Sequence, residues 1–309
     1  PPRRGVGDLP RRHAAPRSAA PARRAQNHNR FRVRGYVGFD HRTATEYGLL
    51  RTYMRAYFQH QNAADVLNLE YAFIQFGGLT AGRVTPIFEH GWNQFYLFSG
   101  QSGFGYHSDI SYVNSLGYTF NAGGGFSATI AIDDPRDRRL SAAGAAMPDV
   151  VASLAYDQAW GSLKLSGALF QLRAANAAVD TTYGYAVEGA AKFNLPMLTK
   201  GSNIWVSGSY SKGSSSYVGF DALSGFGIGS FQTIGTNATD WFVPAGLTSL
   251  KLSTNFSVMG ALQVYFTPTI SASIGGTYAS HNPFGANNTI KTASVIGQVA
   301  WTPVAGFLI

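Results

Sequence analysis

The most constraining feature of the sequence is the stretch LKLSTNFSVMGALQVYF at residues 250–266, in which two kinds of side chain alternate. Every second residue from Leu250 to Phe266 belongs to a mostly apolar set, and the residues between them are mostly polar or small. A period of two places the two sets on opposite faces of an extended strand. At about 3.3 Å per residue the strand would run about 55 Å, against roughly 17–20 Å for a typical strand. We therefore expect a long strand with an apolar environment on one face and a polar one on the other.

The same alternation continues along most of the chain after residue 30. It predicts strands at 31–41, 47–60, 67–76, 79–86, 111–120, 125–133, 149–157, 161–172, 183–194, 203–213, 250–266, 269–280 and 290–302, with another beginning near 305. The alternation is less regular at 67–76 than elsewhere. We find no helical period of 3.6 residues, and no run approaches the ~18 consecutive apolar residues of a membrane-spanning helix. The pattern therefore predicts an all-β chain.

The lengths of the connections indicate which all-β architecture is present. Short joints are expected at 42–46, 77–78, 121–124, 158–160, 195–202, 267–268 and 303–304, and longer ones at 87–110, 134–148, 173–182, 214–249 and 281–289. Short and long connections thus alternate, and 61–66 is the exception because it is short where a long one is due. An antiparallel meander whose two ends face different compartments has this property, whereas a soluble β-sandwich has no such order. The fold predicted is a transmembrane antiparallel β-barrel.

The net charge of +8 comes from the N-terminal end of the chain and not from its body. Residues 1–34 hold ten arginines and a single acid, Asp8, while the rest of the chain holds 14 Lys and Arg against 15 Asp and Glu. Residues 1–30 are therefore treated as a separate basic Arg/Pro/Ala-rich tail, either disordered, resembling a transit peptide, or the product of a wrongly framed gene. A near-neutral body argues against nucleic acid as a partner. The absence of cysteine excludes disulfides and thiol chemistry.

The sequence contains no pattern that predicts catalysis, a metal site or a cofactor. The seven histidines lack metal-ligand spacing, and the glycine-rich stretches at 123–126 and 225–229 do not match a phosphate-binding fingerprint. The charged run at 133–139, with three aspartates and three arginines, is interpreted as a solvated loop of mixed charge. We therefore expect neither an enzyme nor a bound cofactor or metal.

The body of the chain resembles the general porins of alphaproteobacterial outer membranes, of the rhizobial and Brucella type. The stretches that carry the resemblance are RGYVGFDHRTATEYGLLRTYMRAYF (34–58), AFIQFGGLTAGR (72–83), GFSATIAIDD (125–134), PDVVASLAYDQAWGSLKLSGAL (148–169), GYAVEGAAKFNLPMLTKG (184–201) and YFTPTISASIGGTY (265–278). The resemblance implies a 16-stranded, trimeric barrel in the lipid and lipopolysaccharide of a Gram-negative outer membrane. It also implies passive diffusion of small hydrophilic solutes and ions, with the loop at 87–110 folded into the lumen.

The chain departs from that family at both ends. The family's signal peptide and first strand are not found, and the chain stops at AGFLI, which leaves about 13–14 strands in a barrel region of 31–309. Because unpaired strand edges in lipid cost several kcal/mol per group, we expect this chain as given not to close a native barrel. The alternatives are a non-functional porin fragment, a β-barrel with a specific uptake or adhesin role, and a soluble β-protein that binds a partner.

The polar half of each alternation predicts the residues that line the channel. We expect a basic wall of Arg32, Arg34, Arg51, Arg55 and Arg83, which would face Glu89 and Asp109 from the loop 87–110 and create a transverse field. The alternative is that these arginines pair with Glu46, Glu70 or Asp40 and merely neutralise the lumen.

Further channel and membrane positions follow from the C-terminal strands. The other expected lumen-lining residues are Lys251, Ser253, Asn255 and Gln263, and the expected interface aromatics are Tyr265, Phe266 and Trp301. Aromatic residues favour strands in any sheet, so the same three could also be ordinary strand residues.

Overall fold

The protein is almost entirely β-structure in the computed structural model, which describes residues 32–61, 64–92, 112–138, 145–219, 240–283 and 289–305. The basic tail expected at 1–30 lies outside these ranges. The strands are β1 (Arg32–Thr45), β2 (Gly48–Gln61), β3 (Ala64–Phe76), β4 (Leu79–Val84), β5 (Val113–Gly123), β6 (Phe126–Asp133), β7 (Asp149–Gln158), β8 (Gly161–Leu172), β9 (Thr182–Asn194), β10 (Asn203–Lys212), β11 (Trp241–Phe242), β12 (Lys251–Leu252), β13 (Thr254–Thr267), β14 (Ile270–Asn282) and β15 (Ile290–Trp301). Two 3₁₀ turns, η3 (Pro135–Asp137) and η4 (Ser215–Val218), lie in the connections.

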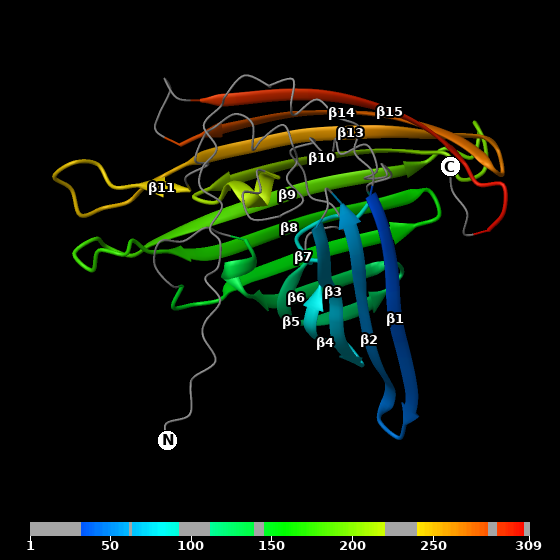
Figure 1. Ribbon diagram of the computed structural model, residues 1–309, viewed down its shortest axis with the longest axis horizontal. Coiled ribbons are helices and arrows are strands. Elements are labelled where there is room, and N and C mark those ends of the chain that lie inside the picture. The colour runs from blue at the N-terminus through cyan, green and yellow to red at the C-terminus, as the bar shows by residue number, and fades with distance from the viewer. Residues whose placement is uncertain are drawn as a thin grey trace.

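The strands form one curved antiparallel sheet (Figure 1). Its order is β1-β2-β3-β4-β5-β6-β7-β8-β9-β10-β13-β14-β15, so each strand pairs with its neighbours along the chain, and only the short pair β11–β12 stands apart. In the part of the chain that the structure describes, β1 and β15 are the two ends of this order. The predicted meander is therefore confirmed, and its thirteen strands agree with the predicted ranges to within a few residues in nearly all cases. Within the same ranges, no helix has the length and apolarity needed to cross a membrane.

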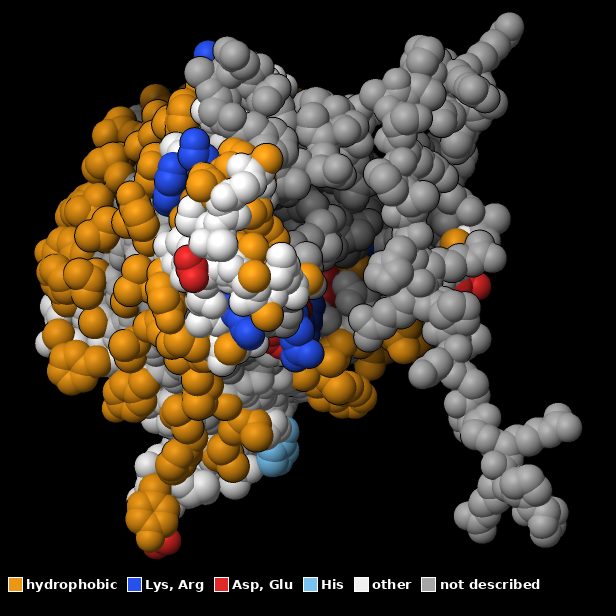
Figure 2. Space-filling view, turned by 90° about the vertical axis from the view of Figure 1, so that its left-hand side faces the viewer, with side chains coloured by type: hydrophobic (Ala, Val, Ile, Leu, Met, Phe, Trp, Pro, Cys, Tyr) orange, Lys and Arg blue, Asp and Glu red, His pale blue; other side chains and the backbone are white. Residues whose placement is uncertain are grey.

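The two faces of the sheet differ as the alternation predicts. On β14, Ser271, Ser273 and Thr277 are buried, whereas Ile274 and Tyr278, which point to the other face, are exposed. Large hydrophobic side chains are exposed along most of the strands, and they cover the outer flank of the molecule in Figure 2. A continuous apolar surface of this extent would be unstable in water and is typical of a protein face in contact with lipid.

The predicted strand at 250–266 is interrupted in the structure. β12 pairs with β11 outside the main sheet, and β13 begins only at Thr254. Leu250, expected on the apolar outer face, is instead buried in a core with Phe88 and Phe170, and Leu252 packs against the same core. The prediction of one continuous strand was wrong because this part of the alternation serves a hydrophobic core at the strand end and not the lipid-facing surface.

The irregular alternation near residue 70 has a specific cause, a β-bulge in β3. Ala56 on β2 pairs with Leu69, but the next residue back, Arg55, pairs with Tyr71, so Glu70 is an extra residue. Asn68 and Glu70 therefore share a face with Tyr71 and the residues at two-residue spacing after it. A single inserted residue reverses which set of side chains faces inward, which explains why residues 67–76 read poorly as a strand.

Tight turns at the short-connection end depend on glycine, which gives a testable contrast. Gly161, in the turn between β7 and β8, has φ +154°, and a Cβ there would collide with the carbonyl oxygen of Lys192. Gly189 in β9 has open space around the position that a Cβ would take, with nothing within 4 Å. We expect Gly161→Ala to lower the free energy of unfolding by roughly 1–3 kcal/mol and Gly189→Ala to change it little. The measurement is urea unfolding of the protein in lipid vesicles, and equal stability of the two variants would contradict the prediction.

Candidate functional site

The inner face of β1–β3 carries three of the predicted arginines in one group. Arg51 is held on two sides, since its Nε and Nη2 donate to the Asp40 carboxylate at 2.9 and 3.0 Å and its Nη1 donates to Gln75 Oε1 at 3.1 Å. Both acceptors come from neighbouring strands, β1 and β3. The two parallel N–H···O bonds to Asp40 fix the plane of the guanidinium as well as its position.

Arg55 is paired with the residue that the bulge inserts. Its Nε lies 2.6 Å from Glu70 Oε2, and the Glu70 residue is only 2% exposed, while the Arg55 side chain is 35% exposed. Its guanidinium carbon lies 4.8 Å from the centre of the Tyr71 ring. The bulge thus places a carboxylate and an aromatic ring, from consecutive residues, around one guanidinium. Because Glu70 is desolvated, this pair is worth more than a surface ion pair, although the exposure of Arg55 limits the gain.

Arg34 completes the group through neutral partners. Its Nε donates to Gln59 Oε1 at 2.9 Å, its Nη1 donates to the Tyr36 hydroxyl at 2.9 Å, and its guanidinium lies 4.0 Å from the Tyr57 ring centre. Arginines and rings therefore interleave over three strands in a surface that we call the arginine–aromatic wall. Its members are Arg34, Arg51, Arg55, Tyr36, Tyr53, Tyr57, Tyr71 and Phe73.

The other two arginines predicted for this wall are placed differently. Only the backbone of Arg32 is described, at the start of β1. Arg83 pairs with Ala72, on the sheet face that carries exposed Ile74, which is opposite to the face of the arginine–aromatic wall. Its Nε donates to the carbonyl oxygen of Leu69 at 3.1 Å, beyond the last β3–β4 pair, and its Nη1 lies 3.4 Å from Asp137. Arg83 therefore covers an otherwise open strand edge. Its guanidinium carbon also lies 5.8 Å from the centre of the Tyr112 ring, which packs against Tyr71 of the arginine–aromatic wall at 4.9 Å, so Arg83 stands at the border of that wall.

The chain after β4 runs against the inner face of β7–β10, some strands round the sheet from the arginines. We call residues 85–92 the inward segment. Phe88 is fully buried in a core to which Val151 on β7, Phe170 on β8 and Ala186 on β9 contribute. The Lys164 ammonium donates to the carbonyl oxygen of Glu89. These contacts hold the inward segment on the inner side of the sheet.

The next residues of the inward segment pack on aromatic rings. The His90 ring lies 4.9 Å from Trp205 on β10 and 5.2 Å from Trp92. The side chain of Glu89, predicted for the acidic side of the channel, is 1% exposed and faces Arg138, with Oε1 3.8 Å from Nη1. Its predicted companion Asp109 lies outside the described residues.

The structure also places the other predicted lining and interface residues. Ser253 and Asn255 are fully buried, Gln263 is half-buried, and Lys251 is exposed in β12, away from the main sheet. Phe266 and Trp301 are exposed at the ends of β13 and β15, and the Tyr265 ring is half-buried.

An aromatic group at the turn end was missed by the sequence analysis. Phe126 lies 4.8 Å from Tyr156, and Trp160 lies 6.4 Å from Tyr156 and 5.7 Å from Phe193, all as ring-centre distances. These rings come from β6, β7, the β7–β8 turn and β9. The signal that could have found them is the recurrence of an aromatic residue beside each short turn. Aromatic girdles of this kind are typical of the membrane interface of β-barrels.

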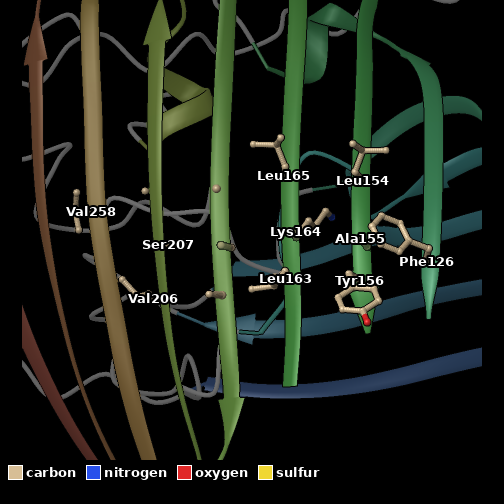
Figure 3. Close-up of a pocket in the computed structure, with 14 residues that line it drawn as sticks. Phe126, Leu154, Ala155, Tyr156, Leu163, Lys164, Leu165, Val206, Ser207 and Val258 are labelled. Carbon is tan, nitrogen blue, oxygen red and sulfur yellow. The ribbon is translucent and has the colours of Figure 1, made fainter. Parts of the chain in front are cut away.

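A recess on the opposite, lipid-facing side of the sheet is not part of this site (Figure 3). Its floor is Gly189 and Gly208, which pair with each other, and its sides include Leu165 and Val258 on the flanking strands. The volume is about 620 Å³. Most of the side chains around it are apolar and belong to the outer set, so the recess opens toward the lipid-facing side.

A curved antiparallel meander, apolar on the outside and charged on the inside, defines a transmembrane β-barrel of the porin type. Residues 5–309 match a family described as a porin subfamily, and the chain belongs to this family. Membership places it in the outer membrane of a Gram-negative cell.

Curated relatives and solved structures agree with this assignment. Porin Omp2b of Brucella abortus and of Brucella suis is 28% identical over 207 residues, which cover 59% of this chain and 51% of the relative. The chain therefore spans about half the length of the curated relatives it matches. The outer membrane channel DcaP of Acinetobacter baumannii has a similar fold, with a TM-score of 0.63 at 13% identity, over 89% of this chain and 86% of that one. OmpF of Salmonella typhi gives 0.58 at 10% identity, over 87% and 78%.

Proposed function

We propose that the protein forms a water-filled outer-membrane channel through which small hydrophilic solutes and ions diffuse passively, without a chemical step. The observation that carries the proposal is the pair of inner surfaces, the arginine–aromatic wall on β1–β3 and the inward segment on β7–β10. A channel narrowed by a segment on one side and lined by fixed charges on the other selects solutes by size and charge. Porin Omp2b is a porin by name, and the family resemblance supports the same activity for this chain.

The charge of the arginine–aromatic wall is smaller than its arginines suggest. Arg51 is paired with Asp40 and Arg55 with Glu70, which is the arrangement that the alternative interpretation anticipated. What remains is a set of oriented ion pairs beside the Arg34 guanidinium, which bonds Gln59 and Tyr36. We propose that these oriented pairs, together with the acidic residues Glu89 and Asp109 of the connection after β4, produce a modest transverse field and a weak preference between ions. The lining roles of Lys251, Ser253, Asn255 and Gln263 remain part of the same proposal.

We also propose that the protein assembles as a homotrimer in lipid that contains lipopolysaccharide. OmpT of Vibrio cholerae, which has a similar fold with a TM-score of 0.50 at 10% identity, has been solved in a trimer form. Chemical cross-linking of the protein in outer-membrane vesicles, followed by mass measurement, tests this assembly.

The experiment for channel function is reconstitution of the protein in planar bilayers and in vesicles. We expect stepwise ion conductance and entry of small sugars, and we expect the double variant Arg51→Gln/Arg55→Gln to shift the reversal potential in a salt gradient toward cations. Arg136→Gln, on an exposed turn, is the control and leaves the reversal potential unchanged. Stable insertion without conductance would refute the proposed channel and favour a non-conducting fragment. Conductance without any shift would remove Arg51 and Arg55 from the narrow part of the channel.

A further inference from the structure

Three connections that are far apart in the sequence meet on the inner side of the sheet. They are the inward segment, the η3 turn between β6 and β7, and the η4 turn after β10. The residues that join them are Glu89, Phe88, Arg138, Tyr217 and Asp149, which we call the three-way junction. A water-filled channel does not require the inward segment, η3 and η4 to contact one another, so their contact needs a separate explanation.

The η3 turn delivers one arginine to the junction and leaves another in solvent. Asp134 caps the turn, since its Oδ1 accepts the Arg136 backbone N–H at 3.0 Å. The Arg136 side chain lies along Asp134 with Nη2 2.7 Å from Oδ2 and is 84% exposed. Arg136 donates hydrogen bonds to Asp134, which lowers the pKa of that carboxyl below its ordinary value. Two residues later, the Arg138 side chain is only 5% exposed. The tight turn therefore points successive arginines in opposite directions.

Arg138 contacts both of the other connections. Its Nη1 lies 3.8 Å from Glu89 Oε1 on the inward segment, and its guanidinium carbon lies 4.3 Å from the centre of the Tyr217 ring on η4. The Tyr217 hydroxyl donates to Asp149 Oδ2 at 2.8 Å. Arg138 thus links the inward segment to η4, and Tyr217 links η4 to β7.

Tyr217 is also the centre of an aromatic stack that includes the inward segment. Its ring is parallel to Phe170 on β8, with 8° between the planes and 5.2 Å between centres, and it meets Phe88 edge-on at 4.8 Å. Two adjacent residues of the inward segment therefore contact the Tyr217 ring in different ways. Phe88 packs on it directly, and Glu89 is linked to it through the Arg138 guanidinium. Phe88 and Tyr217 are both fully buried.

Arg138 supplies positive charge to a part of the junction that is rich in buried acidic residues. Glu89, Asp133 and Asp149 are all buried around the Arg138 guanidinium, and the Lys164 ammonium donates to the Glu89 carbonyl oxygen. Buried carboxylates without a cation repel one another in a medium of low dielectric constant, and a buried arginine is stable only with acidic or aromatic partners. Removing Arg138 would take away a positive charge that offsets the buried carboxylates at the base of the inward segment.

We propose that Arg138 is a positioning residue that fixes the inward segment through the three-way junction and thereby sets the width and steadiness of the channel. The inference rests on the proposed channel function for its consequence, but not for the contact itself. The interaction joins a turn between β6 and β7 to a segment that follows β4, so it acts between connections and not within the sheet.

Hydrogen–deuterium exchange of the protein in lipid vesicles tests the positioning role independently of conduction. In Arg138→Gln we expect the amides of residues 87–92, including the Glu89 N–H that donates to the Pro86 carbonyl, to exchange at least about tenfold faster than in the unmodified protein. The amides of β13 and β14 keep their protection. Arg136→Gln is the matched control from the same turn, and its exchange should equal that of the unmodified protein.

Further variants keep the inference open to refutation. Arg138→Lys retains the positive charge and should restore part of the protection. Glu89→Gln breaks the same contact while Arg138 stays in place, and it should raise the exchange rates as Arg138→Gln does. Unchanged exchange at 87–92 in both Arg138→Gln and Glu89→Gln would overturn the proposal. Single-channel current is then recorded from the same samples, where faster exchange should accompany larger current fluctuations. If the unmodified protein conducts no ions but the exchange result holds, the channel function fails and the positioning role stands.

Discussion

Replacing Phe88 with alanine is expected to detach the inward segment from the inner wall and to widen the channel. Phe88 is fully buried against Tyr217, Phe170 and Val151, and truncation of a buried phenylalanine costs about 3–5 kcal/mol. The loss falls on local anchoring and not on the strand ladder, because Phe88 belongs to a connection. We therefore expect the barrel to remain folded while the free energy that holds the segment in place is largely lost.

The effect is measured as single-channel conductance and as the largest sugar that enters reconstituted vesicles. Both should rise in Phe88→Ala, with frequent transitions between current levels. Phe120→Ala, on the exposed outer face of β5, removes the same side chain from a lipid-facing position and should leave both quantities unchanged. A Phe88→Ala channel with the original conductance and size limit would show that the segment is held by other contacts or does not narrow the path.

The second large effect is expected when the ion pair between Arg55 and Glu70 is broken from either side. Glu70→Gln leaves the Arg55 cation facing the lumen, so selectivity should move toward anions. Arg55→Gln leaves a buried carboxylate, so selectivity should move toward cations and the free energy of unfolding should fall by roughly 1–3 kcal/mol, a value reduced by the partial exposure of Arg55. Opposite shifts from two neutral substitutions are the signature of a paired site.

Reversal potentials in a salt gradient measure the selectivity, and urea unfolding measures the stability. The matched control is Asp65→Asn, which removes another β3 carboxylate whose side chain is 88% exposed and pairs with an exposed histidine, His60. It should change neither quantity by a measurable amount. Shifts of the same sign in Glu70→Gln and Arg55→Gln would contradict the paired arrangement.

The strands were predictable because lipid on one side and a polar interior on the other impose strict alternation. All thirteen strands of the main sheet were expected. The predicted bounds were most accurate for strands that have lipid on one side and the polar interior on the other along their whole length, such as β8 at 161–172. The same logic failed at Leu250, since a buried core at a strand end also selects apolar residues at every second position. Alternation shows that one face of a strand is in an apolar environment, but it does not distinguish lipid from a buried protein core.

The contacts of the candidate site were less predictable because they join distant parts of the chain. The sequence predicted Arg51 and Arg55 as neighbours on the inner face, and it included Asp40 and Glu70 among their alternative partners. The β-bulge was visible only as irregular alternation. Arg83 was predicted for the arginine–aromatic wall. Its pairing with Ala72 puts its backbone position on the opposite face of the sheet, and its guanidinium reaches the border of the wall at Tyr112.

The interpretation of residues 133–139 as a solvated loop was wrong for part of that stretch. Asp133 and Arg138 are buried, whereas Arg136 is exposed. A run of mixed charge has no period that distinguishes the side chains that turn inward from those that do not. That difference is created by the 3₁₀ turn that Asp134 caps and by the residues that receive Arg138, Glu89 and Tyr217. Glu89 and Tyr217 are distant in the chain, so the local sequence does not reveal them.

The β-bulge has a consequence for how the channel wall responds to voltage. Glu70 binds the Arg55 guanidinium at its edge, and the next residue, Tyr71, lies against its face, so the group is restrained both within its plane and perpendicular to it. A lysine on a flexible stem would swing when the membrane potential changes, whereas a guanidinium clamped in two directions keeps its orientation. The current through such a passage should therefore rise in simple proportion to the applied potential, because the ions move while the wall stays still.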